Sequence, residues 1–143
     1  MKRYMLWAMF AVAAIVLVLT PQVATAQENF KASYLTTNQG HDGKYDVYSG
    51  SGNGTIVGSF TTWDETWIHP WNSLQGTTII TAANGDTLDI VFEQTWDGRE
   101  WVGTFQIVGG TGRFPDASGG GTMVVISNNN GTFTLTFTGT ISF

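Results

Sequence analysis

The chain has 143 residues, with six Lys or Arg, 11 Asp or Glu, two His and no Cys, for a formal charge of −5. The absence of cysteine excludes disulfides, a lipid-anchored N-terminal cysteine and a thiol nucleophile. The excess of acidic residues would repel phosphate backbones and anionic lipid surfaces, so we expect no nucleic-acid partner.

The first 26 residues have the pattern of a secretory signal. Lys2 and Arg3 precede an apolar run over residues 4–19, and an Ala-x-Ala site follows at 24–26. We therefore predict cleavage before Gln27 and a secreted or periplasmic protein that has no membrane contact after cleavage. The alternative is an uncleaved anchor, because the run is near the lower limit for a membrane span. Removing 1–26 takes two of the six cations and leaves 117 residues with a formal charge of −7.

Apolar and polar residues alternate through most of the chain after residue 26, as they do in half-buried strands. At the C-terminus, for example, Phe133, Leu135 and Phe137 alternate with threonines. Asn-Gly and Asp-Gly pairs at 53–54, 84–85, 97–98 and 130–131 predict tight turns between such runs. The resulting strands lie near residues 28–37, 44–50, 54–63, 76–82, 86–95, 100–107, 119–127 and 132–143. Sequential hairpins of this number predict one all-β domain over 27–143, a closed eight-stranded antiparallel up-and-down barrel.

Residues 107–121, IVGGTGRFPDASGGG, hold six glycines and one proline. They do not fit a dinucleotide or P-loop, because Pro115 stands where a glycine is needed, no Lys-Ser/Thr pair is present and no helix follows. Strands are predicted on both sides, so we interpret the segment as a shaped connection between two barrel strands, with one aromatic ring free to enter the barrel end. The residues of this structural motif are Gly109, Gly110, Gly112, Arg113, Phe114 and Gly119.

Three segments, at 81–90, 103–123 and 131–143, resemble small secreted bacterial proteins with an allene oxide cyclase-like barrel. That superfamily also contains the plant dirigent proteins, and the likeness spans roughly residues 53–143. The resemblance implies an eight-stranded barrel whose lumen holds an apolar ligand, and it implies trimers in many relatives. It implies no activity here, because the polar cavity residues of the cyclases and dirigents cannot be matched one by one, and Pro115 departs from the small residue expected after Gly-Arg-Phe.

The stretch 63–71, WDETWIHPW, concentrates aromatic rings beside acidic residues and a histidine. Pro70 and the local polarity predict an irregular excursion between strands, with at most one helical turn. Two interpretations stay open: the rings plug one end of the barrel, or they contact a ligand. The candidate ligand-binding residues are Trp63, Trp67, His69 and Trp71.

Glu93 is the remaining candidate. It alternates with Leu88, Ile90 and Phe92, so we expect it on the barrel exterior. If the faces were inverted, Glu93 would enter the lumen, where desolvation would raise its pKa and suit it to acid or base catalysis. We predict no catalytic residue, no cofactor and no metal site, because the chain has neither a nucleophile elbow nor the ligand spacing of a metal cage.

These observations favour an exported, non-catalytic β-barrel that binds a small apolar or aromatic ligand or serves as a structural module, with a homotrimer as the candidate assembly. One alternative is an isomerase, cyclase or dirigent-type enzyme that uses the lumen as a template. Another is a small outer-membrane barrel, whose apolar strand faces would point outward to lipid. A lumen filled by Phe and Leu side chains would exclude a ligand and a lumenal reaction alike.

Overall fold

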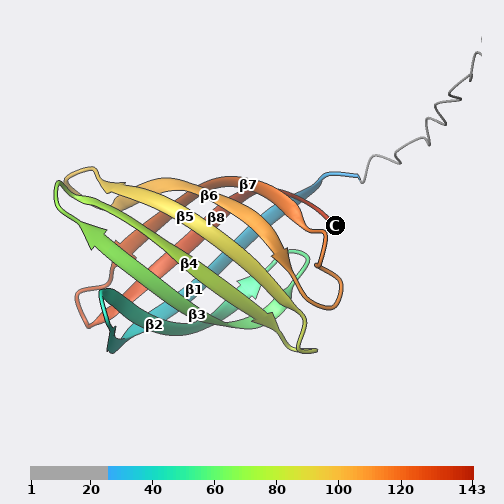
Figure 1. The fold of residues 1–143 in the computed structure, drawn as a ribbon, viewed down its shortest axis with the longest axis horizontal. Coiled ribbons are helices and arrows are strands. Elements are labelled where there is room, and N and C mark those ends of the chain that lie inside the picture. Colours follow the sequence, from blue (N-terminus) through green and yellow to red (C-terminus); the bar gives the residue numbers. More distant parts are fainter. Residues whose placement is uncertain (1–25) are drawn as a thin grey trace, which may run out of the picture.

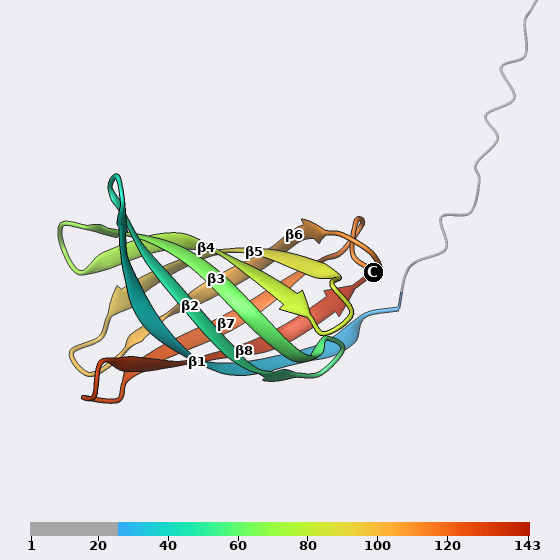
Figure 2. The same ribbon diagram turned by 90° about the horizontal axis from the view of Figure 1, so that it is seen from below.

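The computed structural model describes residues 26–143, which form a closed antiparallel barrel of eight strands in chain order (Figures 1 and 2). The strands are β1 (Glu28–Asp42), β2 (Tyr45–Gly54), β3 (Gly58–His69), β4 (Ser73–Ala82), β5 (Thr87–Trp96), β6 (Trp101–Gly110), β7 (Ser118–Ser127) and β8 (Thr132–Ser142). β1 pairs with both β2 and β8, so the sheet has no free edge. The predicted fold class is therefore confirmed. The predicted signal lies outside the described residues, except for Ala26.

Several strand bounds differ from the sequence-based expectation, and β1, predicted to end near residue 37, continues to Asp42. The stretch 63–71 is not an irregular excursion, because β3 continues to His69 and pairs with β4 along its length. Its Trp and Thr residues suit a half-buried strand, and only Pro70–Asn72 form the turn. Asn53 and Gly54 likewise belong to β2 rather than to a turn. The chain reverses after them, where the Thr55 N–H donates to Lys31 O at 2.8 Å.

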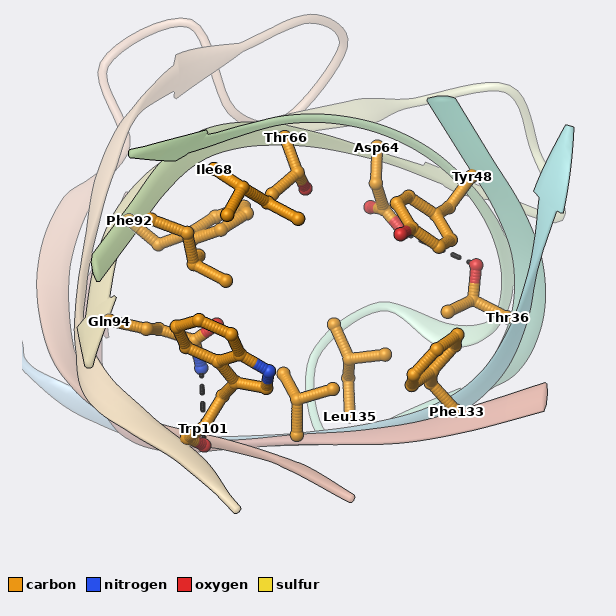
Figure 3. Close-up of a pocket in the computed structure, with 12 residues that line it drawn as sticks. Thr36, Tyr48, Asp64, Thr66, Ile68, Phe92, Gln94, Trp101, Phe133 and Leu135 are labelled. Carbon is orange, nitrogen blue, oxygen red and sulfur yellow. Dashed lines mark hydrogen bonds between the residues drawn. The ribbon is translucent and has the colours of Figure 1, made fainter. Parts of the chain in front are cut away.

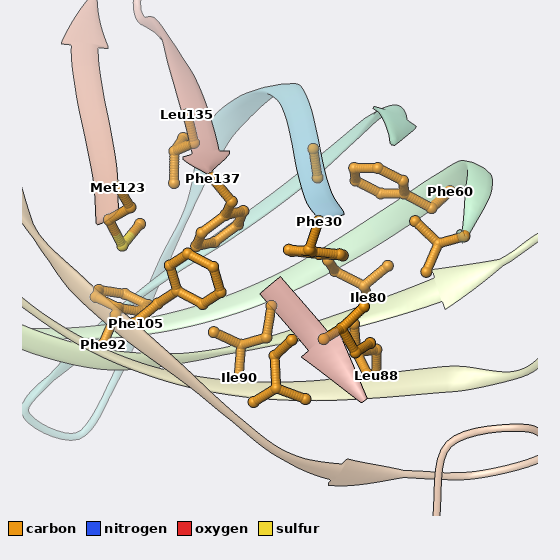
Figure 4. Close-up of a cluster of buried hydrophobic side chains, with 14 of the residues drawn as sticks. Phe30, Phe60, Ile80, Leu88, Ile90, Phe92, Phe105, Met123, Leu135 and Phe137 are labelled. Carbon is orange, nitrogen blue, oxygen red and sulfur yellow. The ribbon is translucent and has the colours of Figure 1, made fainter. Parts of the chain in front are cut away.

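Most of the buried apolar side chains point into the lumen, and they fill one half of it. This packed half lies at the end where the C-terminus sits in Figure 1, and its side chains are shown in Figure 4. Phe105 and Phe137 meet edge to face with ring centroids 4.9 Å apart, and Phe30 lies 5.9 Å from Phe105. Other members of the packed half are Ala32, Phe60, Ile80, Leu88, Ile90, Ile107 and Ile141.

Inward glycines make room for these rings. Gly139 is paired with Phe30 across β1 and β8, and Gly52 is paired with Tyr34 across β1 and β2. A Cβ at Gly139 would lie 2.1 Å from the carbonyl oxygen of Gly120, and a Cβ at Gly52 would lie 2.0 Å from that of Ser33. The strands therefore coil too closely at these points for any side chain, and a large ring beside each glycine fills the tapered interior.

The connection between β6 and β7 closes the packed half, as its sequence suggested. Phe114 is fully buried, and its ring lies 5.2 Å from that of Phe143. Gly112 has a φ of +64°, and a Cβ there would meet the Asp86 carboxylate. Of the motif residues, Gly109 and Gly110 end β6, while Gly119 lies in β7.

Arg113 ties three turns together at this end. Its Nε donates to Asp86 Oδ2 at 3.1 Å in the β4–β5 turn, and its Nη2 donates to Ile56 O at 3.2 Å in the β2–β3 turn. The glycine-rich connection is thus an ordered plug rather than a linker.

The barrel exterior is rich in threonine and serine, with scattered apolar side chains such as Leu35 and Ile126. On β8, residues Phe133, Leu135 and Phe137 point inward and the threonines between them point outward. On β8 this orientation is the opposite of what the outer-membrane alternative predicts, while Leu35, Ile79, Val108 and Ile126 of other strands are exposed. Residues 26–143 contain no helix of the length and hydropathy needed to cross a membrane.

Candidate functional site

The other half of the lumen holds a pocket of about 160 Å³ (Figure 3). It opens at the end formed by the β1–β2, β3–β4, β5–β6 and β7–β8 turns, opposite the C-terminus in Figure 1. Its aliphatic lining residues are Ile68, Leu74, Val125 and Leu135. Its aromatic lining residues are Tyr48, Phe92, Trp101 and Phe133. Its other polar lining residues are Thr36, Asp64, Thr66 and Gln94. We call this region the open half.

On β1 and β3, the inward positions become smaller and more polar toward this end, which leaves space in the open half. On β3 the inward series begins at Phe60 and continues through Thr62, Asp64 and Thr66. On β1 the corresponding series ends at Thr36. Threonine and aspartate cannot fill the volume that a phenylalanine fills in the packed half, so a cavity remains.

Asp64 is the acidic residue of the pocket lining. Its side chain points from β3 toward the interior beside Tyr48 (Figure 3), and the residue is only 3% exposed. The Tyr34 hydroxyl donates to Asp64 Oδ1 at 3.1 Å. Asp64 Oδ2 lies 3.5 Å from Thr36 Oγ1, and that hydroxyl also donates to Ser49 O at 2.9 Å.

Burial raises the pKa of the Asp64 carboxyl to about 6. The hydroxyls of Thr78, Tyr34 and Thr36 lower that pKa but do not offset the loss of hydration. Burial and the nearby Asp64 charge also raise the pKa of Tyr34, which keeps its phenol protonated as a donor. The carboxyl therefore changes charge close to neutral pH, which makes it the candidate functional group of the lumen.

The pocket wall opposite Asp64 is formed by the amide of Gln94 and by the rings of Trp101 and Phe92. Gln94 is 3% exposed and its Nε2 donates to Trp101 O at 3.5 Å. The Trp101 ring lies on that side of the pocket, and Phe92 lies next to Gln94 on the same side (Figure 3). A ligand in the open half would therefore lie between a carboxyl on one side and aromatic faces on the other.

The structure places the predicted tryptophans outside the lumen. Trp63 and Trp67 point outward from β3, because Thr62, Asp64 and Thr66 occupy its inward positions. The interpretation in which these rings plug the barrel is therefore wrong. Successive side chains of a strand point to opposite faces. Because β3 is continuous, its even-numbered residues point to the interior and its odd-numbered tryptophans point outward.

The other three predicted residues meet on the barrel exterior. Glu93 is exposed on β5 between the buried Phe92 and Gln94, so the inverted-face alternative is wrong. Together with His69 and Trp71, Glu93 lines a shallow surface hollow around the β3–β4 turn. Trp71 is 95% exposed and has a φ of +75°. None of these three side chains lines the lumenal pocket.

Sequence reasoning missed Asp64 as a site residue, although the signal was present. Phe60 is an apolar strand residue, and counting forward in twos from it reaches Asp64. The count could not be extended to Asp64 because residues 63–71 were predicted to be irregular. Within residues 26–143, no cluster of three or more His, Cys, Asp or Glu side chains could hold a metal ion.

Comparison with known proteins gives no further identification. No protein-family model matches the chain. No curated protein matches it either. The likeness to allene oxide cyclase-like barrels therefore stays a prediction made from the sequence.

Proposed function

We propose that this protein is an exported β-barrel that binds one small, largely apolar or aromatic molecule in the open half of its lumen and carries out no chemistry on it. The observation that carries the proposal is the pocket itself. An apolar cavity of about 150 Å³ in another protein binds benzene, so a pocket of about 160 Å³ has the size for a single-ring molecule. Export rests on the signal-like pattern of residues 1–26.

The pocket has the general composition of a ligand site. Eight of its lining residues are aliphatic or aromatic, and the few polar groups are buried on defined strands. Such sites combine apolar surface for affinity with a small number of fixed polar groups for orientation. The packed half adjoins the pocket and supports its lining, because Phe92 and Leu135 belong both to the buried core and to the pocket lining.

Ligand-observed NMR with a library of single-ring compounds tests this function. We expect several compounds to bind the native protein in competition with one another. The Val125→Phe variant should lose them, because Val125 lines the pocket and a phenyl ring there would occupy it. Val124→Phe is the matched control, since Val124 points outward from the same strand. Absence of binding to the native protein, or equal binding to both variants, would refute the proposal.

A second function is favoured by one observation. Asp64 is a buried carboxyl with a pKa of about 6 in an apolar pocket, which are the conditions for a general acid or base. An isomerase or cyclase would use this group on a substrate folded against the pocket wall. Turnover of any bound compound that stops in Asp64→Asn but persists in Glu65→Gln would favour the enzyme over the binding protein.

A further inference from the structure

We propose that the ligand of the open half is a small organic cation, a single-ring or similarly sized ammonium compound, with Asp64 as its counter-ion. This inference rests on the proposed binding function and names its ligand class. It is carried by three features of the pocket: an acid with no cation beside it, the neutral character of the hydrogen-bond donors to that acid, and the aromatic walls.

The first feature is the charge balance. Asp64 is the acid in the lining, and no Lys, Arg or His lines the pocket. Two cations lie in the turns at this end. Lys44 has its Nζ 3.8 Å from the ring centroid of Trp67 on the barrel exterior, and Arg99 is exposed in the β5–β6 turn. A buried carboxylate without a cation is costly, so a ligand that brings a positive charge would be attracted to it.

The second feature is the hydrogen bonding of the carboxyl. Oδ1 accepts the Tyr34 proton at 3.1 Å, and Oδ2 accepts a longer bond of 3.5 Å from Thr36. The hydroxyl of Thr78, which is paired with Asp64 across β3 and β4, also lowers the pKa of the carboxyl. Thr36 has a single hydroxyl proton, and its bond to Ser49 O is shorter at 2.9 Å. All of these donors are neutral hydroxyls, and the Thr36 bond is long, so an ammonium N–H that enters the pocket would supply a stronger, charge-assisted bond to the carboxylate.

The third feature is the set of rings around the space. Tyr48 and Phe133 meet edge to face 5.8 Å apart on the Asp64 side, while Phe92 and Trp101 lie on the opposite side (Figure 3). Aromatic faces attract ammonium groups through their quadrupoles, and rings combined with a carboxylate select a cation over a neutral molecule of the same shape. A neutral apolar ligand would use the rings but would leave the carboxylate unpaired.

The titratable groups that face Asp64 allow this pairing. They are Tyr34 on β1 and Tyr48 on β2, whose pKa values are both raised by burial, so both phenols stay neutral at physiological pH. Asp46 of β2 lies nearer the pocket mouth and pairs with His41. The inward residues of β4, β5 and β8 that reach this region bring no charge. Asp64 is therefore the ionisable acid of the pocket lining, and Asp46 near the mouth adds to the negative potential there.

Calorimetric titration with benzylamine and with the neutral benzyl alcohol, two probes of the same size, tests the inference. At pH 7.5 we expect benzylammonium to bind at least tenfold more tightly than the alcohol. Asp64→Asn should abolish the difference, while Glu65→Gln, which removes the same charge from the outer face of the same strand, should keep it. At pH 5 the affinity of the native protein for benzylamine should fall about tenfold, because Asp64 is then mostly protonated while an alkylammonium, with a pKa near 10, stays charged.

The outcomes separate the inference from the function beneath it. If neither probe binds the native protein, the proposed function fails and the inference fails with it. If both bind with equal affinity at pH 7.5, the pocket is a ligand site but the cation inference is overturned. A preference for benzylamine that survives Asp64→Asn also overturns it. If that variant does not fold, the comparison of probes at the two pH values on the native protein still decides the question.

Discussion

The packed half and the open half of the lumen are formed by the same eight strands, yet the side chains that point inward differ between the two halves. At one end, Phe30, Phe105 and Phe137 pack against one another beside inward glycines. At the other end, β1 and β3 point threonines and Asp64 inward, and a pocket of about 160 Å³ lies between these residues and the rings of the opposite wall. The comparison teaches that the same eight strands form a buried aromatic core in one half and leave a cavity in the other.

Truncation of one ring in each half is the strongest way to test this division. Phe137 is fully buried against the rings of Phe30, Tyr34 and Phe105, so Phe137→Ala should lower the free energy of unfolding by about 3–5 kcal/mol. Phe133 borders the pocket and is only partly buried, so Phe133→Ala should cost less than half as much. Urea unfolding of both variants measures the difference. Equal losses would show that the two halves do not differ in packing.

The pH dependence of stability isolates the acid of the open half. The pKa of Asp64 is 3.8 when unperturbed and about 6 in the fold, so the folded state holds the extra proton between about pH 4 and pH 6. Stability should therefore fall as pH rises through this interval, by about 3 kcal/mol for this group.

Asp64→Asn should remove that fall, because its amide does not ionise. The measurement is the unfolding free energy of the native protein minus that of the variant at pH 4 and at pH 7.5, with Glu65→Gln as the control. Parallel profiles for the native protein and Asp64→Asn would contradict the raised pKa.

Added volume should be tolerated in one half and not in the other. Ala32 lies among the rings of the packed half, so Ala32→Leu should cost about 1–3 kcal/mol by overpacking. Thr66 faces the pocket, and Thr66→Leu should change stability by no more than about 1 kcal/mol because the new side chain enters existing space. Thermal unfolding of the two variants gives the comparison, and a larger loss for Thr66→Leu would place the free volume elsewhere.

The smallest effect concerns the plug of the packed half. Arg113 bonds to Asp86 and to Ile56 O but is exposed, so Arg113→Ala should cost no more than about 1 kcal/mol. We expect ligand affinity in the open half to remain unchanged in this variant. A measured change in that affinity would mean that the two ends of the barrel are coupled.

The fold could be predicted from the sequence because its signals are local. Alternation places Phe133, Leu135 and Phe137 on one face, and Asp97-Gly98 and Asn130-Gly131 mark turns that the structure confirms. Each signal involves neighbouring residues whose preferences agree with the barrel. The end of β3 was not predicted, because Pro70 and the acidic residues suggested a loop while pairing with β4 kept the strand extended.

The candidate site was not predicted because it depends on contacts between distant strands. Asp64 on β3 meets Tyr34 and Thr36 of β1 only when the barrel closes. Whether the lumen is open depends on the summed volume of inward side chains from every strand, which no local pattern reports. The tryptophans of residues 63–71 were the predicted ligand-binding residues, but the ionisable side chain of this segment that lines the pocket is Asp64.

Methyl NMR of the protein saturated with the tightest-binding single-ring compound tests the central claim most directly. The open half and the packed half each supply several methyl-bearing residues, so the two regions report separately. We predict shifts at the methyl groups of Ile68, Leu74, Val125 and Leu135. We predict no shifts beyond experimental error at those of Ile80, Leu88, Ile90 and Ile141. Shifts at the second set without shifts at the first would contradict the division of the lumen into a packed half and a ligand-binding half.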